Sequence, residues 1–270
     1  MVAGAGKGWA KGRSAANDPR IARAAAAHRG KQYVLHVPPE QDGRRITPAA
    51  RLDWTPALAY AVGLIATDGS IARGRTVGFP SADRELVSHL LTCLGKHNKI
   101  GRIRTRTGGV LYRTQIGDAA FCRWLMSIGI GPRKSLTIGP LVVPDDHLLT
   151  LTRGLLDGDG SVINKRARAD VGRRTDYYWE YLQTRFVCAS RPHLEWLRDR
   201  LMLALDVDGL IIKRAARGRK HDCFTLRYGK VASQRLLPAL YFDTRAPRLE
   251  RKWRVWADYA DRHGLDPRGT

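Results

Sequence analysis

The sequence predicts an α+β fold made of two similar half-domains related by a pseudo-twofold axis, each with the order helix, strand, strand, helix, strand, strand, helix. Three observations support this prediction. One short segment with a central acidic residue occurs twice, and both copies are followed by the same succession of strand-like and helix-like segments. The 270 residues include 43% hydrophobic residues, typical of a folded chain, and 47 Lys and Arg against 25 Asp and Glu give a net charge of +22. An excess of this size favours a polyanionic partner, most often nucleic acid.

The repeated segment is an apolar helix end followed by Asp-Gly. Residues 63–71 read GLIATDGSI, and residues 154–162 read GLLDGDGSV. Asp68 and Asp159 therefore occupy the same place in the two copies. Because the copies lie a half-domain apart, the repeat indicates duplicated half-domains and not a short solenoid repeat.

The helix before each acidic residue has recognisable ends. Residues 55–56, Thr-Pro, form a typical helix start, and the first helix is expected over residues 57–66. Asp145 or Asp146 begins the second helix, which is expected through residues 148–156.

The downstream elements match between the halves. Strands are expected at 76–81, 100–106 and 110–117 in the first half and at 184–190, 210–214 and 224–229 in the second. Helices are expected at 84–94 and 119–128, and at 192–205 and 231–240. The main difference is an insertion rich in Arg and Tyr between the first two strands of the second half.

A carboxylate at a helix C-terminus is unfavourable, because the helix dipole places partial negative charge there. Its repetition calls for a compensating cation, and a divalent metal would supply one. Small residues four apart on one face of each helix would let the two backbones approach closely. These are Ala59 and Gly63 in the first helix and Thr150 and Gly154 in the second. The helix ends then converge, and two carboxylates with adjacent carbonyls form an all-oxygen site suited to Mg²⁺.

Positions 61–69 (AVGLIATDG) and 152–160 (TRGLLDGDG) resemble the motif of the LAGLIDADG homing endonucleases, in the single-chain form with two motifs. The resemblance covers residues 52–256. It implies two saddle-shaped antiparallel sheets that meet at two central LAGLIDADG helices. It also implies a site-specific double-stranded DNA endonuclease that cuts a long asymmetric site by metal-dependent phosphodiester hydrolysis and leaves staggered ends.

The same resemblance assigns metal ligands. The acid at the eighth position of each motif, Asp68 or Asp159, is implied to bind metal, with the carbonyl oxygens of Thr67 and Gly158 as further ligands. Two or three Mg²⁺ ions are expected between the two acidic motifs. The sixth position, which holds Asp157 in the second motif, is variable in the family and is given no metal role.

A basic residue is also implied near each acid, at the end of each half-domain. Lys134 and Lys252 fit this description and would stabilise charge at phosphate or orient water. The alternative is that both are surface lysines beside Pro-bearing loops.

The family often places a polar residue at the end of the second strand. Counting back from the following helices gives Ser81 and Ala189. Ser81 could serve, whereas Ala189 cannot, which leaves Gln183 or Ser190 as substitutes in the second half.

The strands supply a basic surface. Arg102, Arg104 and Arg106 alternate, so their side chains share one face of a strand. Burying such a face would be costly without partners, so it meets solvent or phosphate. Arg113 and Gln115 are expected on the adjacent strand, facing the same groove. The remaining candidates for DNA contact are Arg73, Arg75, Lys165, Arg185, Lys213, Arg217 and Arg227.

The strand length sets the size of the expected site. A strand of ten residues spans roughly 33 Å, or about ten base pairs at roughly 3.4 Å each. Two unlike sheets on one chain would therefore read a long site with unequal halves, and the protein is expected to act as a monomer.

Two other functions stay open. One is a non-catalytic nucleic-acid binder on the same fold, either an intron RNA maturase or a transcriptional regulator; retention of both acids argues against it. The other is a basic structural RNA-binding protein. His97-Asn98 is a poor match to an HNH nuclease centre, and the absence of a Walker loop or dinucleotide fingerprint argues against nucleotide-driven activity. No small-molecule substrate is expected.

The expected domain organisation is a basic N-terminal arm and linker (1–50), two half-domains (51–142 and 143–262) and a tail (263–270). Four widely spaced cysteines favour a reducing compartment. No apolar stretch reaches membrane-spanning length, and no apolar signal segment precedes the fold. We therefore expect a soluble intracellular protein without a membrane partner. The expected setting is the cytoplasm or nucleoid of a bacterium with a GC-rich genome or of a phage host, with an organelle as the other setting.

Overall fold

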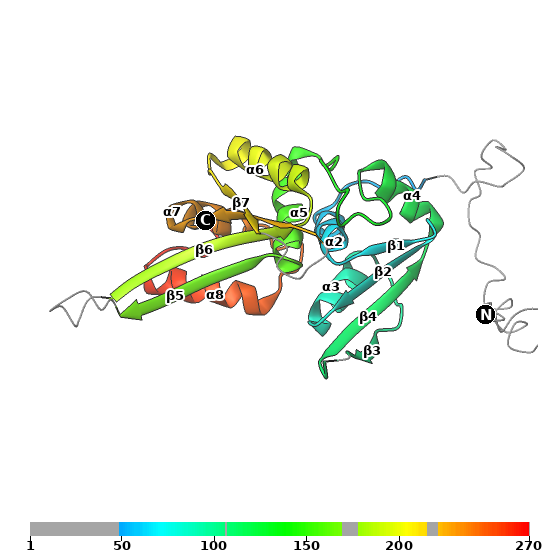
Figure 1. Cartoon of the computed structure of the whole chain (residues 1–270), viewed down its shortest axis with the longest axis horizontal. Helices are drawn as coiled ribbons and strands as arrows, with labels where there is room; N and C mark the ends of the chain where they lie inside the picture. Colours follow the sequence, from blue (N-terminus) through cyan, green and yellow to red (C-terminus); the bar gives the residue numbers. More distant parts are fainter. Residues whose placement is uncertain (1–48, 106, 169–177, 215–220, 270) are drawn as a thin grey trace, which may run out of the picture. The chain divides into compact units, whose positions relative to one another are not determined.

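The computed structural model describes residues 49–105, 107–168, 178–214 and 221–269, which belong to one unit of the chain beginning at Thr47. This unit contains two four-stranded antiparallel sheets and seven described helices (Figure 1). The predicted α+β class is therefore confirmed. The predicted basic arm lies outside the described residues, apart from its last two. Among the described helices, none is both long and apolar enough to cross a bilayer.

The first half-domain has the predicted order of elements. These are α2 (Pro56–Thr67), β1 (Ser70–Ala72), β2 (Thr76–Ser81), α3 (Arg84–Cys93), β3 (Gly101–Arg104), β4 (Val110–Gly117) and α4 (Ala119–Ser127). The strands form one sheet in the order β1-β2-β4-β3.

The second half-domain repeats this plan. It contains α5 (Asp145–Asp157), β5 (Ser161–Arg168), β6 (Tyr178–Cys188), α6 (Arg191–Leu205), β7 (Leu210–Arg214), β8 (Cys223–Tyr228) and α7 (Lys230–Tyr241). Its sheet has the matching order β5-β6-β8-β7. The two halves thus share the predicted order of elements, and the structure shows that they share the order of strands in the sheet as well.

One helix, α8 (Glu250–Arg262), was not predicted. Its buried residues include Trp253, Trp256 and Ala260, which recur at the spacing of one helix face. The sequence analysis assigned Lys252 to no helix, whereas the structure places it in the first turn of α8. The aromatic periodicity after Lys252 was the signal that could have revealed this helix.

The predicted insertion lengthens a hairpin. Strands β5 and β6 contain 8 and 11 residues, against 3 and 6 in β1 and β2. Residues 169–177, between β5 and β6, lie outside the described part of the chain. The second sheet therefore has a much longer first hairpin than the first sheet.

Helix α2 begins as predicted. The hydroxyl of Thr55 accepts a hydrogen bond from the amide of Leu58 (3.1 Å), and Pro56 occupies the first turn, where its missing N–H is not needed. In α5, Asp145 and Asp146 lie in the first turn, where carboxylates interact favourably with the helix dipole.

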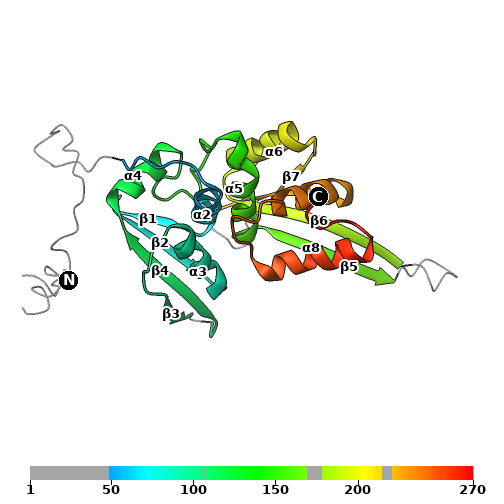
Figure 2. The ribbon, with the colours of Figure 1, turned by 180° about the vertical axis from the view of Figure 1, so that it is seen from behind.

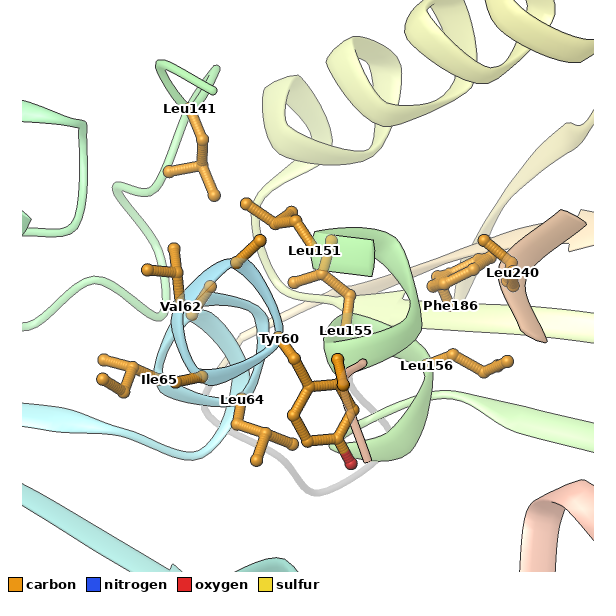
Figure 3. Packing of buried hydrophobic residues seen from close by; sticks show 14 of the residues in the cluster. Tyr60, Val62, Leu64, Ile65, Leu141, Leu151, Leu155, Leu156, Phe186 and Leu240 are labelled. Carbon is orange, nitrogen blue, oxygen red and sulfur yellow. The ribbon is translucent and has the colours of Figure 1, made fainter. Parts of the chain in front are cut away.

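Helices α2 and α5 pack side by side (Figure 3), and two glycines lie at their contact. A Cβ atom on Gly63 would lie 2.2 Å from the carbonyl oxygen of Leu151, and one on Gly154 would lie 2.3 Å from the carbonyl oxygen of Tyr60. No side chain fits at either position, so the two backbones are in direct contact. This is the close approach that the small residues predicted, and it brings the two helix ends together.

Among the described residues, helices cover one face of each sheet and leave the other face without a helix. Helices α3 and α4 pack against the first sheet, and α6, α7 and α8 pack against the second. Strands β5 and β6 lie in front of α8 in Figure 1, and α8 lies in front of them in the reverse view of Figure 2. We call the face of each sheet that carries no helix its open face.

Candidate active site

The junctions that follow α2 and α5 pack against each other. Asp68 is the C-terminal cap of α2, and Asp159 follows Gly158, the cap of α5. A Cβ atom on Gly158 would lie 2.0 Å from the hydroxyl oxygen of Thr67, so the residues that precede the two acids are in contact. The structure thus brings Asp68 and Asp159 into one site.

The pKa values of both carboxyls are raised. Burial raises the pKa of Asp68 to about 6, and the negative charge of Asp159 adds to this, while Lys134 and Lys252 oppose it. Asp159 is exposed on one side, but the surrounding protein removes part of its hydration, and this raises its pKa. The positive charges of Lys134 and Lys252 lower the pKa and only partly offset this effect. Ionising both carboxyls together is unfavourable, and a cation bound between them would offset this cost.

Lys252 lies against the end of α5. Its side chain is only 5% exposed, and the three N–H donors of its ammonium group are shared among four backbone carbonyl oxygens. These belong to Leu156 (2.7 Å), Asp157 (2.8 Å), Gly158 (3.1 Å) and Gly160 (2.7 Å). Burial lowers its pKa to about 8, against the attraction of Asp157. Lys252 thus satisfies carbonyls that the helix end would otherwise leave without donors.

Lys134 lies against the end of α2 in a similar way. It is 6% exposed, and its ammonium group donates to the carbonyl oxygen of Thr67. Burial lowers its pKa, while Asp159 and Asp68 raise it. Both predicted lysines therefore lie beside the acids. Sequence reasoning did not foresee that they bond to Thr67 and Gly158, the residues whose carbonyls the family resemblance implies as metal ligands.

The segments that carry the two lysines also join the half-domains. Arg251, next to Lys252, forms a bidentate ion pair with Asp83 at the start of α3, with N–O distances of 3.0 and 2.8 Å. In the other direction, the hydroxyl of Ser190 at the start of α6 donates to the carbonyl oxygen of Ile138. Each lysine segment is thus tied to the opposite half.

At the ends of β2 and β6, the equivalent residues of the two halves are not the pair that counting along the sequence gave. Ser81 accepts a hydrogen bond from the amide of Asp83 (3.1 Å), and Cys188 accepts one from the amide of Ser190 (3.3 Å). Cys188, and not Ala189, is therefore the counterpart of Ser81. The count was displaced because the sequence analysis began the following helix at residue 192, whereas α6 begins at Arg191. Of the two proposed substitutes, Ser190 is bonded to Ile138, and Gln183 accepts hydrogen bonds from Arg185.

Asp157, at the sixth position of the second motif, is fully buried. One of its oxygens accepts hydrogen bonds from the hydroxyl of Tyr60 on α2 (2.8 Å) and from the amide of Leu249 before α8 (2.7 Å). Burial raises its pKa to about 6, against these hydrogen bonds and the charges of Lys252 and Arg153. Asp157 therefore joins the two central helices to the start of the helix that carries Lys252. The sequence did hold a signal for this internal role of Asp157, because Arg153 lies four residues earlier, on the same side of the helix. In the structure Arg153 is also buried.

The donor set is compatible with Mg²⁺. Within the described residues there is no group of three or more His, Cys, Asp or Glu side chains that could hold a metal. The site instead offers two carboxylates and backbone oxygens. Mg²⁺ commonly binds through one or two carboxylates, keeps several waters and takes the remaining oxygens from phosphate, so this set fits it better than Zn²⁺.

No protein-family model and no curated protein sequence matches this chain. Solved structures do match. Meganuclease I-SmaMI bound to uncleavable DNA superposes with a TM-score of 0.51 at 13% identity, covering 80% of this chain and 95% of that one. A second complex of I-SmaMI gives a TM-score of 0.50 at 13% identity, covering 82% and 94%. The chain has the LAGLIDADG homing endonuclease fold.

Another protein with a LAGLIDADG domain also matches. Full-length DUF199/WhiA from Thermatoga maritima superposes with a TM-score of 0.46 at 15% identity. The match covers 76% of this chain and 60% of that one, so this chain spans well under the whole length of that protein.

Within the LAGLIDADG fold, the predicted basic residues of the second sheet fall on both faces. Residues paired across antiparallel strands point to the same face. Arg185 pairs with Arg227, and both alternate with the buried Leu226 and Phe186, so they lie on the open face. Lys165 shares this face.

Lys213 lies on the other face of the second sheet. It pairs with Phe224, which has the parity of the buried Leu226, and its ammonium group is 2.7 Å from the carboxylate of Asp222. The structure therefore does not bring Lys213 together with Arg227. The predicted Arg217 lies outside the described residues.

The first sheet corrects one expectation. Arg113 and Gln115 are exposed and alternate with the buried Thr114 and Ile116, so they lie on the open face as predicted. Arg102 and Arg104 do share one face, but their partners are Tyr112 and Val110, which have the parity of Thr114. These two arginines therefore lie on the opposite face from Arg113. The alternation along β3 was correct, but the β3–β4 register decided the face.

The exposure of Arg102 and Arg104 has a simple reason. Strand β3 is the edge of its sheet, and both side chains are exposed there. Charged residues are common on edge strands, where they discourage pairing with other chains. Arg106 lies outside the described residues, and Arg73 and Arg75 are exposed in the turn between β1 and β2.

Proposed function

We propose that this chain is a homing endonuclease: a monomeric enzyme that cuts a long asymmetric site in double-stranded DNA by Mg²⁺-dependent phosphodiester hydrolysis and leaves staggered ends. The observation that carries the proposal is the pairing of Asp68 and Asp159 at the convergent ends of α2 and α5. Binding alone would not need this arrangement, because two ionised carboxylates repel the phosphates of DNA unless a cation lies between them.

In this proposal, Asp68 and Asp159 hold two or three Mg²⁺ ions with the carbonyl oxygens of Thr67 and Gly158. When bound, Mg²⁺ supplies the Lewis-acid chemistry of phosphodiester hydrolysis. Each carbonyl oxygen has two lone pairs, so its hydrogen bond with a lysine leaves one free for a further ligand. Lys134 and Lys252 add positive charge beside the scissile phosphates, where negative charge develops during the reaction.

The DNA is proposed to lie along the open faces of both sheets. Arg113 and Gln115 on the first sheet and Lys165, Arg185 and Arg227 on the second present donors for phosphates and base edges. Arg73 and Arg75 extend this surface at the β1–β2 turn. I-SmaMI, which has the same fold, is bound to DNA in the two structures compared above.

Cleavage of a randomised library tests the proposal. The full chain is incubated with Mg²⁺ and linear duplexes that contain a randomised central segment, and the cut ends are sequenced. We expect one sequence family with staggered ends. Asp68→Asn and Asp159→Asn should bind the selected duplex as wild type does but leave it uncut. A protein that binds a selected duplex and never cuts it, with any divalent cation, would overturn the proposal.

A non-catalytic nucleic-acid binder on the same fold is the competing function. The observation in its favour is that ammonium groups already lie at both helix ends, where they supply positive charge without a metal. The Asp68→Asn variant separates the two functions. A nuclease loses cleavage and keeps its affinity, whereas a binder that depends on the lysines alone shows no change.

A further inference from the structure

The long β5–β6 hairpin carries an aromatic pair on the open face of the second sheet. The rings of Trp179 and Tyr181 stack with a centroid distance of 5.2 Å and an interplanar angle of 11°. Trp179 is 41% exposed although it is a large aromatic residue. Lys165 on β5 lies directly opposite Tyr181. We call Trp179, Tyr181 and Lys165 the outer strip.

The other face of the same hairpin is tied down. Glu180 lies between Trp179 and Tyr181 in the sequence and points to the other face of the sheet. It accepts hydrogen bonds from Asn164 (2.8 Å) and Arg262 (3.0 Å), and its other oxygen lies 2.8 Å from a ring nitrogen of His263. Arg262 and His263 lie at the end of α8. Because side chains alternate along a strand, this anchorage holds Trp179 and Tyr181 on the open face.

The outer strip continues the proposed DNA surface. Gln183, Arg185 and Arg227 lie on the same face, nearer to the acidic pair. None of the described residues of β5 to β8 on this face is acidic, whereas Glu180 lies on the other side. The surface is therefore complementary to a polyanion along the described length of the hairpin.

The chemistry of the strip suits duplex DNA. An exposed apolar ring surface is unfavourable in water unless a partner covers it. Ring faces make apolar contact with the methyl group of thymine in the major groove, and a lysine beside them reaches phosphate. The stack restricts both rings, so less conformational entropy is lost when a partner binds.

The reach of the hairpin differs between the halves. Strand β5 begins two residues after Asp159 and has 8 residues, whereas β1 begins two residues after Asp68 and has 3. The difference of five residues corresponds to at most about 17 Å at roughly 3.3 Å per residue. That length equals about five base pairs of B-DNA.

We propose that the outer strip reads base pairs at the far end of the half-site under the second half-domain, so that this half-site is about five base pairs longer than the other. This inference rests on the proposed function, since it names the part of the DNA that the open face contacts. It predicts an unequal target with a thymine-rich outer segment on one side only.

Binding selection measures this directly. The full chain selects duplexes with a long randomised segment in Ca²⁺, which supports binding while cleavage is avoided, and the selected positions are sequenced. For wild type, we expect sequence preference to extend further on one side of the central base pairs. The double variant Trp179→Ala/Tyr181→Ala should lose preference at that outer end only. Its affinity for the wild-type sequence should fall about tenfold.

Three controls make the result specific. Tyr178→Ala removes a neighbouring aromatic residue that is 60% exposed on the opposite face, so it should leave the selected sequence unchanged. Arg113→Ala, on the first sheet, should weaken preference in the other half-site. Lys165→Ala lies on a different strand, and it should weaken binding to the full duplex but not to one trimmed at the outer end.

The outcomes separate the two proposals. Equal half-sites in wild type, or a loss from Trp179→Ala/Tyr181→Ala that falls on the same side as that from Arg113→Ala, would overturn the inference and leave the nuclease function standing. A chain that enriches no sequence and binds no duplex more tightly than another would overturn the proposed function and the inference together.

Discussion

Lys252 holds the backbone on both sides of Asp159. Its ammonium group lies within hydrogen-bond distance of the carbonyl oxygens of Gly158 (3.1 Å) and Gly160 (2.7 Å), and it shares its three N–H donors between these and two carbonyls in the last turn of α5. The other acid is held differently, because the amide of Asp68 bonds to the carbonyl oxygen of Leu64 (3.2 Å) within its own helix. The two halves thus place equivalent acids by different contacts.

This difference predicts unequal effects of removing the two lysines. Lys252→Met keeps the apolar stem but leaves four carbonyl oxygens without their donor, and we expect a loss of about 3 kcal/mol in the free energy of unfolding. Lys134→Met removes a single such bond and should cost about 1 kcal/mol. Urea unfolding at neutral pH without metal measures both. Equal losses would show that the four contacts of Lys252 do not act together.

A variant of Asp68 should stabilise the metal-free chain while it abolishes cleavage. The pKa of Asp68 is raised from 3.8 to about 6, so the folded chain binds its proton more tightly than the unfolded chain does. Ionisation therefore costs stability at every pH above about 6, and the cost disappears as the pH falls below 3.8.

We expect Asp68→Asn to be more stable than wild type by about 1 kcal/mol at pH 7.5, after allowance for the partial exposure of the carboxyl. This advantage should vanish near pH 4. Thermal or urea unfolding in the presence of a chelator measures the difference at both pH values. An advantage that persists at pH 4 would point to a cause other than charge.

The contact between α2 and α5 predicts that neither central glycine tolerates a methyl group. Gly63→Ala and Gly154→Ala would each place a carbon within about 2.3 Å of a carbonyl oxygen, so the helices must separate. We expect each to cost at least 3 kcal/mol. Gly117→Ala is the matched control, because nothing lies within 4 Å of its added carbon. Unfolding midpoints of the three variants provide the comparison.

The anchorage of the long hairpin predicts a pH-dependent loss of stability. Burial raises the pKa of Glu180, but hydrogen bonds from Asn164, His263 and Arg262 outweigh it and lower the pKa to about 2. A depressed pKa contributes stability that is complete above about pH 4.5 and is lost as the pH falls toward 2.

Glu180→Gln should therefore be less stable than wild type by about 2 kcal/mol at pH 6. The gap should narrow steadily between pH 4.5 and the acid limit of folding, as urea unfolding at a series of pH values would show. Tyr178→Ala, on the same face but exposed, should show no such dependence. A constant gap across this range would exclude an electrostatic anchorage.

Several features could be predicted because they depend on local spacing. The start of α2 at Thr55-Pro56 and the bounds of β2, at residues 76–81, follow from capping and alternation within a few residues. The meeting of Gly63 and Gly154 followed from small residues on two helix faces. Helix α8 was missed although Trp253 and Trp256 carried its periodicity.

Other features required contacts between distant segments. Asp157 was given no role from the motif, yet it bonds to Tyr60, 97 residues away, and to Leu249, 92 residues away. The counterpart of Ser81 was displaced by one position for a local reason, since the helix that follows Cys188 begins at Arg191 and not at residue 192, where the sequence analysis placed it.

Residue types at fixed short spacing were enough to predict the duplicated α+β plan, the two acids at convergent helix ends and the alternation of arginines along β3. The face of the sheet that Arg102 and Arg104 occupy, and the carbonyls that Lys134 and Lys252 bind, depend on contacts between distant segments. A shift of one residue in strand register reverses the direction of every side chain, and a buried ammonium group binds the oxygens that the folded backbone brings within reach.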